Sequence, residues 1–229
     1  MIETWRTQLY FLGFFASLAF AARFTIQWLA SEKRRKSYVP PLFWKLSLVG
    51  NLLFALHAFI QIQVHICLVQ SYNAIFSWRN LNLMKEPQQQ ASFKTTVFLI
   101  GISTLSVLTI FTIQGLSLYG HYDWVRTPTM PWNNTPGEKL SLLWHILGSI
   151  GIFLFSSRFW IQWWQAEKNN KSSLGITFWQ VSITGALISL LYFIKMYDVV
   201  NILGQIMSII PAIRNLQLIH KQKKPLGKL

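Results

Sequence analysis

Residues 158–185 read RFWIQWWQAEKNNKSSLGITFWQVSITG, and residues 23–50 read RFTIQWLASEKRRKSYVPPLFWKLSLVG. The two stretches align without a gap at an offset of 158 − 23 = 135 residues. A repeat of this length indicates that one structural unit was duplicated. The same offset superposes Glu32 on Glu167, Gln70 on Gln205 and Arg79-Asn80 on Arg214-Asn215.

The composition indicates a membrane protein. Apolar residues make up 52% of the chain and charged residues 12%, about half the charged share of soluble domains. Apolar runs of about 20 residues recur from end to end, the length that a helix needs to cross a bilayer core. The net charge of +14 comes from basic residues at the ends of these runs, which indicates membrane orientation and argues against nucleic-acid binding. Cys67 is the sole cysteine, so there is no disulfide framework.

The apolar runs predict an all-α integral membrane protein with seven transmembrane helices. The spans lie at residues 8–30, 41–61, 64–84, 94–118, 140–165, 175–195 and 198–219. Three helices reverse the direction of the chain, so the fourth restores it and two parallel three-helix repeats result, in a 3+1+3 order. The predicted domains are 1–86 (first three-helix repeat), 87–138 (linker helix and outer loop), 139–220 (second three-helix repeat) and 221–229 (basic cytoplasmic tail).

The distribution of lysine and arginine predicts the orientation. Basic residues crowd segment 33–36, tail 221–228 and the helix ends on the same side. Positive residues favour the cytoplasmic side, so we expect the N-terminus outside and the C-terminus in the cytoplasm. The opposite side holds Arg6, Arg126, Lys139 and Lys195.

Each first helix carries an arginine inside its apolar run, at Arg23 and Arg158, with Gln27 and Gln162 four residues later on the same face. An arginine in hydrocarbon is costly, so it either extends its guanidinium to the interface or turns it inward. Turned inward, a guanidinium beside an amide suits the oxygens of a phosphate or carboxylate. Both alternatives stay open from the sequence.

The third helix of each repeat carries a second polar stripe. Amide residues on membrane helices commonly hydrogen-bond neighbouring helices, and the same groups can bind a substrate. Pro211 predicts a break or a kink in the last helix, which its counterpart Phe76 does not share. The candidate substrate-binding residues of both repeats are Arg23, Gln27, Gln70, Arg79, Asn80, Arg158, Gln162, Gln205, Arg214 and Asn215.

Catalytic and metal-binding motifs are missing from the sequence. It contains no HExxH, no G-x-S-x-G and no glycine-rich phosphate loop. The five histidines are scattered without ligand spacing. We therefore expect no catalytic residue, no bound metal and no cofactor, and the sequence favours a protein that is not an enzyme.

A longer motif occurs in both repeats: Arg-Phe-x-x-Gln-Trp, then Glu, Ser, Phe-Trp-x-x-Ser-x-x-Gly and a closing Gln…Arg-Asn-x-x-Leu. Both copies resemble the lipid A biosynthesis N-terminal domain family, the membrane segment associated with lipid-A-disaccharide synthase. More distantly, the chain resembles SWEET and PQ-loop transporters, whose 3+1+3 repeats agree with the order of the spans. The first copy departs at His57, Gln63 and Val69, where the second has Tyr192, Asp198 and Gly204.

The resemblance implies a multi-pass protein of the bacterial inner (cytoplasmic) membrane in lipid A metabolism. Its partners would be membrane lipids, a lipid A precursor or lipid-linked sugar, and a lipid-A-disaccharide synthase. In one hypothesis, a cleft between the repeats binds an anionic lipid-linked or sugar substrate and moves or presents it across the bilayer. In the other, the chain is a non-catalytic scaffold for the synthase, whose glycosyltransferase domain the sequence lacks, and its polar residues only hold helices together.

Overall fold

The structure, a computed structural model, describes residues 2–120, 125–126, 131 and 140–223. These residues form eight α-helices and no strand, apart from an isolated antiparallel bridge between Gln63 and Val125. Two short 3-10 helices, η1 (Leu9–Phe11) and η2 (Pro87–Gln89), accompany them. The α-helices are α1 (Ile2–Gln8), α2 (Leu12–Arg34), α3 (Pro41–Ile60), α4 (Val64–Asn82), α5 (Phe93–Tyr119), α6 (Leu142–Asn169), α7 (Ile176–Lys195) and α8 (Val199–Lys223).

Each of the seven predicted spans coincides with one long helix. Pro41 occupies the first turn of α3, where its missing N–H costs least. Helices α2 and α6 extend past the predicted spans and end where Arg35 and Asn170 adopt the left-handed conformation, with φ of 50° and 46°. Charged residues therefore mark the end of the apolar run but not the end of the helix.

Helix α8 is continuous through Pro211, so the predicted break is wrong. Proline removes one backbone hydrogen bond, but α8 packs along both α2 and α7, and this packing supports the turns on either side. The side-chain amide of Asn215 also donates to the Pro211 carbonyl oxygen at 2.8 Å.

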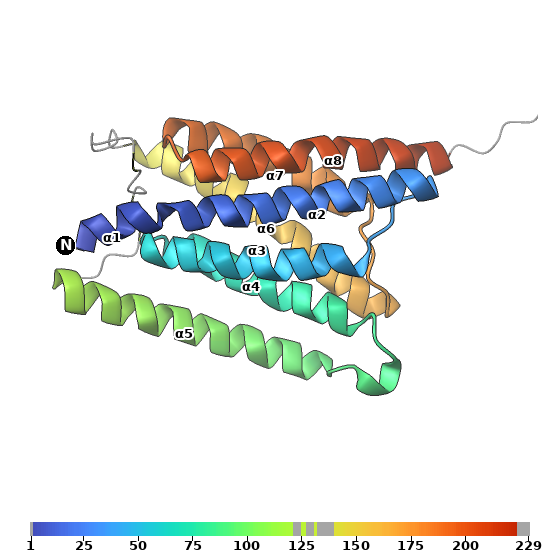
Figure 1. Ribbon diagram of the computed structural model, residues 1–229, viewed down its shortest axis with the longest axis horizontal. Coiled ribbons are helices and arrows are strands. Elements are labelled where there is room, and N and C mark those ends of the chain that lie inside the picture. The colour runs from blue at the N-terminus through green and yellow to red at the C-terminus, as the bar shows by residue number, and fades with distance from the viewer. Residues whose placement is uncertain (1, 121–124, 127–130, 132–139, 224–229) are drawn as a thin grey trace, which may run out of the picture.

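Six helices form a closed ring. In chain order α2 packs on α3 and α3 on α4, and in the same way α6 packs on α7 and α7 on α8. The ring closes because α8 lies against α2, and α4 lies against α6. Helix α5 lies outside and packs mainly on α4 (Figure 1). Helices α2 and α6 run in the same direction, and α1 begins at the end of the bundle opposite to that where α8 finishes (Figure 1).

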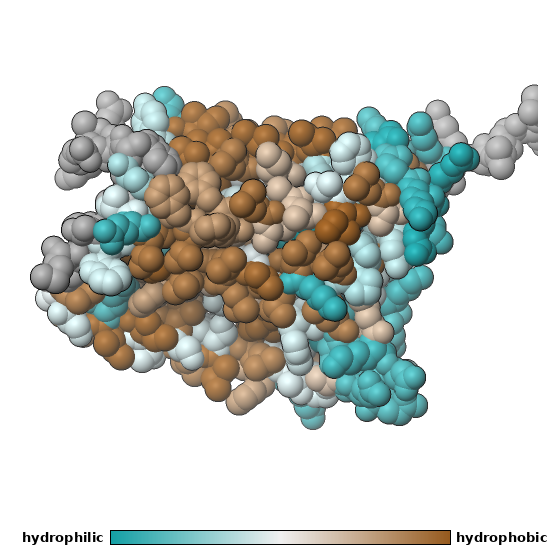
Figure 2. Space-filling view, in the orientation of Figure 1, coloured by the Kyte–Doolittle hydropathy of each residue, from teal (hydrophilic) through white to brown (hydrophobic). Residues whose placement is uncertain are grey.

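The surface has an apolar middle and a polar end (Figure 2). Six of the described helical segments are long and apolar enough to cross a membrane, and they contain α2, α3, α5, α6, α7 and α8. Helix α4 is not among them, because residues such as Gln70, Asn73 and Arg79 interrupt its apolar sequence. The exposed basic segment 33–36 consists of the last two residues of α2 and the two that follow, at the polar end in Figure 2.

Glycine and serine allow the helices within each repeat to approach closely. A Cβ atom on Gly185 would lie 2.3 Å from the backbone nitrogen of Phe155, and one on Gly50 would lie 2.6 Å from the Phe20 ring. The hydroxyl of Ser182 donates to a carbonyl of its own helix at 2.6 Å, as its repeat counterpart also does. The two glycines therefore serve helix packing.

Candidate functional site

A cavity lies at the centre of the six-helix ring and is lined by residues from all six helices. Its enclosed part has a volume of about 50 Å³. The empty space around this part, which includes open solvent, amounts to about 640 Å³. None of the described residues that line it is acidic. Its polar lining consists of Arg23, Asn51, Gln70, Asn73, Ser156, Arg158, Asn201, Gln205 and Ser208.

The two arginines are buried in the cavity wall without anionic partners. Arg23 is 3% exposed and Arg158 is 2% exposed, and the Nε and Nη1 atoms of each have no hydrogen-bond partner among the described residues. The Cζ atom of Arg23 lies 4.3 Å from the ring centroid of Phe20 and 5.6 Å from that of Phe159. The Cζ atom of Arg158 lies 3.4 Å from the centroid of Phe155 and 4.8 Å from that of Phe159. Two guanidinium groups thus share one aromatic ring, and the inward alternative for these arginines is confirmed.

Amide oxygens of the third helices also lack partners. The Oε1 atoms of Gln70 on α4 and Gln205 on α8, and the Oδ1 atom of Asn73, are buried without a donor in the part of the chain that the structure describes. All three side chains line the cavity. The cavity wall therefore offers both hydrogen-bond donors and hydrogen-bond acceptors.

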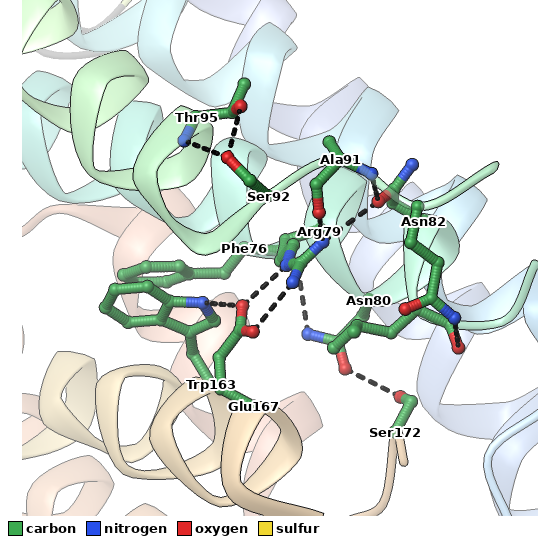
Figure 3. Close-up of polar contacts among 12 residues, drawn as sticks. Phe76, Arg79, Asn80, Asn82, Ala91, Ser92, Thr95, Trp163, Glu167 and Ser172 are labelled. Atoms are coloured by element: carbon green, nitrogen blue, oxygen red, sulfur yellow. Dashed lines mark hydrogen bonds and ion pairs between the residues drawn. The ribbon is translucent and has the colours of Figure 1, made fainter. Parts of the chain in front are cut away.

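Arg79, near the C-terminal end of α4, donates four hydrogen bonds (Figure 3). Its guanidinium donates to both carboxylate oxygens of Glu167, at 2.5 and 2.7 Å. It also donates to Asn82 Oδ1 at 2.9 Å and to the Ala91 carbonyl at 2.5 Å, while the indole of Trp163 donates to Glu167 at 2.8 Å (Figure 3). This ion pair joins α4 of the first repeat to α6 of the second.

The repeat-related ion pair joins α8 to α2. Arg214 donates through Nε to one carboxylate oxygen of Glu32 and through Nη2 to the other, the latter at 3.0 Å. Each side chain of this pair is 34% exposed, whereas Arg79 and Glu167 are 5% and 12% exposed. The two pairs therefore have the same geometry in different surroundings.

Reciprocal amide pairs lie beside the ion pairs. Gln27 and Asn215 exchange hydrogen bonds at 2.8 and 2.9 Å. Gln162 and Asn80 exchange them at 2.7 and 2.9 Å. Ser172 donates to Asn80 as well (Figure 3). These four amides join first helices to third helices across the two repeats, and none lines the cavity.

A buried carboxyl group lies between α7 and α8. Asp198 is 0% exposed and accepts hydrogen bonds from the backbone N–H and the side-chain amide of Asn201, at 3.1 and 2.8 Å. Burial raises the pKa of the Asp198 carboxyl, and the hydrogen bonds from Asn201 oppose that rise. Among the described residues, no three His, Cys, Asp or Glu side chains lie together as metal ligands would.

The profile of the Lipid A Biosynthesis N-terminal domain matches residues 12–82 and 147–217. The chain belongs to this family. The first lipid A biosynthesis domain coincides with α2–α4, and the second lies within α6–α8. The family expected from the sequence motifs is thereby confirmed.

Relatives named lipid-A-disaccharide synthase contain a segment similar to this pair of lipid A biosynthesis domains. The protein of Chlamydia caviae is 38% identical over 219 residues, that of Chlamydia felis 38% over 216 and that of Chlamydia pneumoniae 37% over 216. Each alignment covers 94% of this chain and 34% of the relative. The chain thus spans about a third of the length of the curated relatives it matches. No solved structure matches it.

The structure divides the predicted substrate-binding residues of the lipid A biosynthesis domains into two groups. Arg23, Arg158, Gln70 and Gln205 line the cavity. The remaining six lie outside its lining, in ion pairs and amide pairs between the repeats: Gln27, Arg79, Asn80, Gln162, Arg214 and Asn215.

Sequence reasoning missed the aromatic surroundings of the arginines. Each arginine has a phenylalanine three residues before it, Phe20 before Arg23 and Phe155 before Arg158. The two phenylalanines are equivalent positions of the repeat, so this pattern could have been found in the sequence. The sequence did not indicate that Phe159, which belongs to the second repeat, contacts the guanidinium groups of both repeats. That contact depends on how the repeats face each other.

Proposed function

We propose that this protein is a membrane component of lipid A biosynthesis whose two parallel three-helix repeats enclose a binding site for the anionic group of a lipid-linked or sugar substrate. The site would present the substrate or move it across the bilayer. The family and the names of the Chlamydia relatives support the assignment to this pathway. Helix α5 is then the linker of a 3+1+3 array of membrane spans.

The observation that carries this proposal is the pair of buried, unpaired guanidinium groups at Arg23 and Arg158. A buried charge without a partner is destabilising, and proteins rarely keep one without a function. Two such cations on one cavity, with no acidic residue in the described lining, make its interior attractive to an anion. A guanidinium fork suits the oxygens of a phosphate.

The membrane placement rests on the six apolar helical segments and on the hydrophilic end of the bundle in Figure 2. Helix α4 would span the bilayer within the protein, since α3, α5 and α6 all pack against it. Basic residues near segment 33–36 favour the cytoplasmic side for that end, which leaves the N-terminus outside the inner membrane.

Photo-crosslinking tests substrate binding. The full chain, in membranes, is labelled with a photoreactive acylated glucosamine 1-phosphate, and wild type is compared with Arg158→Ala and Arg23→Ala. Each substitution removes the charged N–H groups that would donate to the phosphate of the substrate, so we expect labelling to fall about tenfold or more. Lys36→Ala, which removes one exposed positive charge, is the matched control and should label like wild type. Undiminished labelling of both arginine variants contradicts the proposal.

The alternative function is a scaffold for the synthase, and the extent of the match to the Chlamydia proteins favours it. This chain corresponds to about a third of the length of proteins named lipid-A-disaccharide synthase, which supports an association between this kind of membrane segment and the synthase. A scaffold would need the contacts between repeats but not the cavity arginines. Co-purification of a lipid-A-disaccharide synthase with wild type and with Arg158→Ala alike, without labelling of either, would favour the scaffold.

A further inference from the structure

The cavity wall carries unsatisfied acceptors next to its unsatisfied donors. Gln70 Oε1, Asn73 Oδ1 and Gln205 Oε1 have no donor among the described residues, although all three belong to the same lining as the two arginines. A buried amide oxygen without a donor is destabilising, as a buried guanidinium without an acceptor is. A ligand that satisfied only the guanidiniums would leave these oxygens unpaired.

Each repeat contributes one hydrogen-bond donor and one hydrogen-bond acceptor to the cavity, from equivalent helices. The donor is on the first helix, at Arg23 or Arg158, and the acceptor is on the third helix, at Gln70 or Gln205, with one repeat length between the copies. Asn73 corresponds to a serine that also lines the cavity. The donor and acceptor groups therefore converge on one space from both halves of the ring.

The chemistry of the ligand follows from this set. An inorganic phosphate dianion accepts hydrogen bonds but carries a single O–H donor, which cannot satisfy the three amide oxygens. An uncharged sugar has donors but no charge for the guanidiniums. A sugar phosphate has both, with hydroxyl groups next to a phosphate. We infer that the cavity binds a sugar phosphate, with the phosphate at Arg23 and Arg158 and sugar donors at Gln70, Asn73 and Gln205; this inference rests on the proposed function.

The space is consistent with this division. The part open to water centres, about 50 Å³, holds roughly four water molecules, which is on the scale of one phosphate group. The wider space of about 640 Å³ includes open solvent, so a sugar ring attached to the phosphate would extend toward the solvent. A free sugar phosphate and the headgroup of a glycolipid present the same chemistry there.

Calorimetry on the full chain in lipid nanodiscs tests the inference with glucose 1-phosphate, inorganic phosphate and glucose. We expect glucose 1-phosphate to bind about tenfold more tightly than inorganic phosphate, and glucose not to bind. The double variant Gln70→Leu/Gln205→Leu should lose this preference and keep the affinity for inorganic phosphate. Equal wild-type affinities for the two phosphates overturn the inference without any variant, as does a double variant that retains the preference.

Two further measurements distinguish a failure of the sugar assignment from a failure of the anion site, and a lipid ligand from a soluble one. Arg158→Ala should lose both phosphates, and if it binds both like wild type, the anion site and the proposed function fail together. If Arg158→Ala loses both while wild type does not distinguish them, only the sugar assignment fails. An acylated glucosamine 1-phosphate in the nanodisc that competes far more strongly than glucose 1-phosphate identifies a lipid headgroup as the source, whereas equal competition identifies a soluble sugar phosphate.

Discussion

Replacing Arg158 by methionine should stabilise the ligand-free protein. An arginine within a membrane helix costs about 2.5–3.5 kcal/mol. Its cation–π contacts with the rings of Phe155 and Phe159 offset this by about 1 kcal/mol of stabilisation. The net cost of about 2 kcal/mol disappears in Arg158→Met, which corresponds to a rise in Tm of roughly 4–8 °C at about 2–4 °C per kcal/mol.

Arg79→Met is the matched comparison, because it makes the same replacement at an arginine that is ion-paired. Glu167 is 12% exposed and would lose its partner, which costs about 3–5 kcal/mol and lowers Tm by roughly 6–20 °C. Thermal unfolding followed by tryptophan fluorescence in detergent measures both changes. If Arg158→Met lowers Tm as Arg79→Met does, Arg158 is needed for the fold, and its role as an unpaired ligand-binding cation is refuted.

Three further predictions use the same unfolding assay. Arg214→Met should lower Tm less than removal of its buried counterpart, because Arg214 and Glu32 are each 34% exposed; an equal loss would contradict this ranking. Burial raises the pKa of Asp198, so the protonated carboxyl stabilises the fold below the usual value of 3.8, and this contribution is lost as pH rises through the raised pKa; Tm of wild type should therefore fall relative to Asp198→Asn as pH rises above about 4, and parallel curves would refute it. Gly185→Ala should cost about 1–3 kcal/mol, since its Cβ would lie 2.3 Å from a backbone nitrogen, whereas Gly101→Ala, with open space around it, should cost nothing.

The helices could be predicted because their signal is local. The apolar runs and the breaks between them determine the spans, and the repeat offset showed that α2 and α6 are equivalent. The roles of the polar residues could not be separated in the same way. Arg23 and Gln27 lie on one helix face, but Gln27 is bound by Asn215, 188 residues away, while Arg23 has no such partner. That difference depends on which helix of the other repeat lies opposite, and no local pattern contains it.

The joint between the repeats is self-complementary. Each third helix supplies an arginine and an asparagine, and each first helix supplies the glutamate and glutamine that receive them. A chain made of one repeat would carry both halves of this joint, so two copies related by a twofold axis would meet through the same contacts. Joining the two subunits of such a homodimer into one chain would keep the same interface between them. Within one chain the two halves can differ from each other, as Phe76 and Pro211 illustrate.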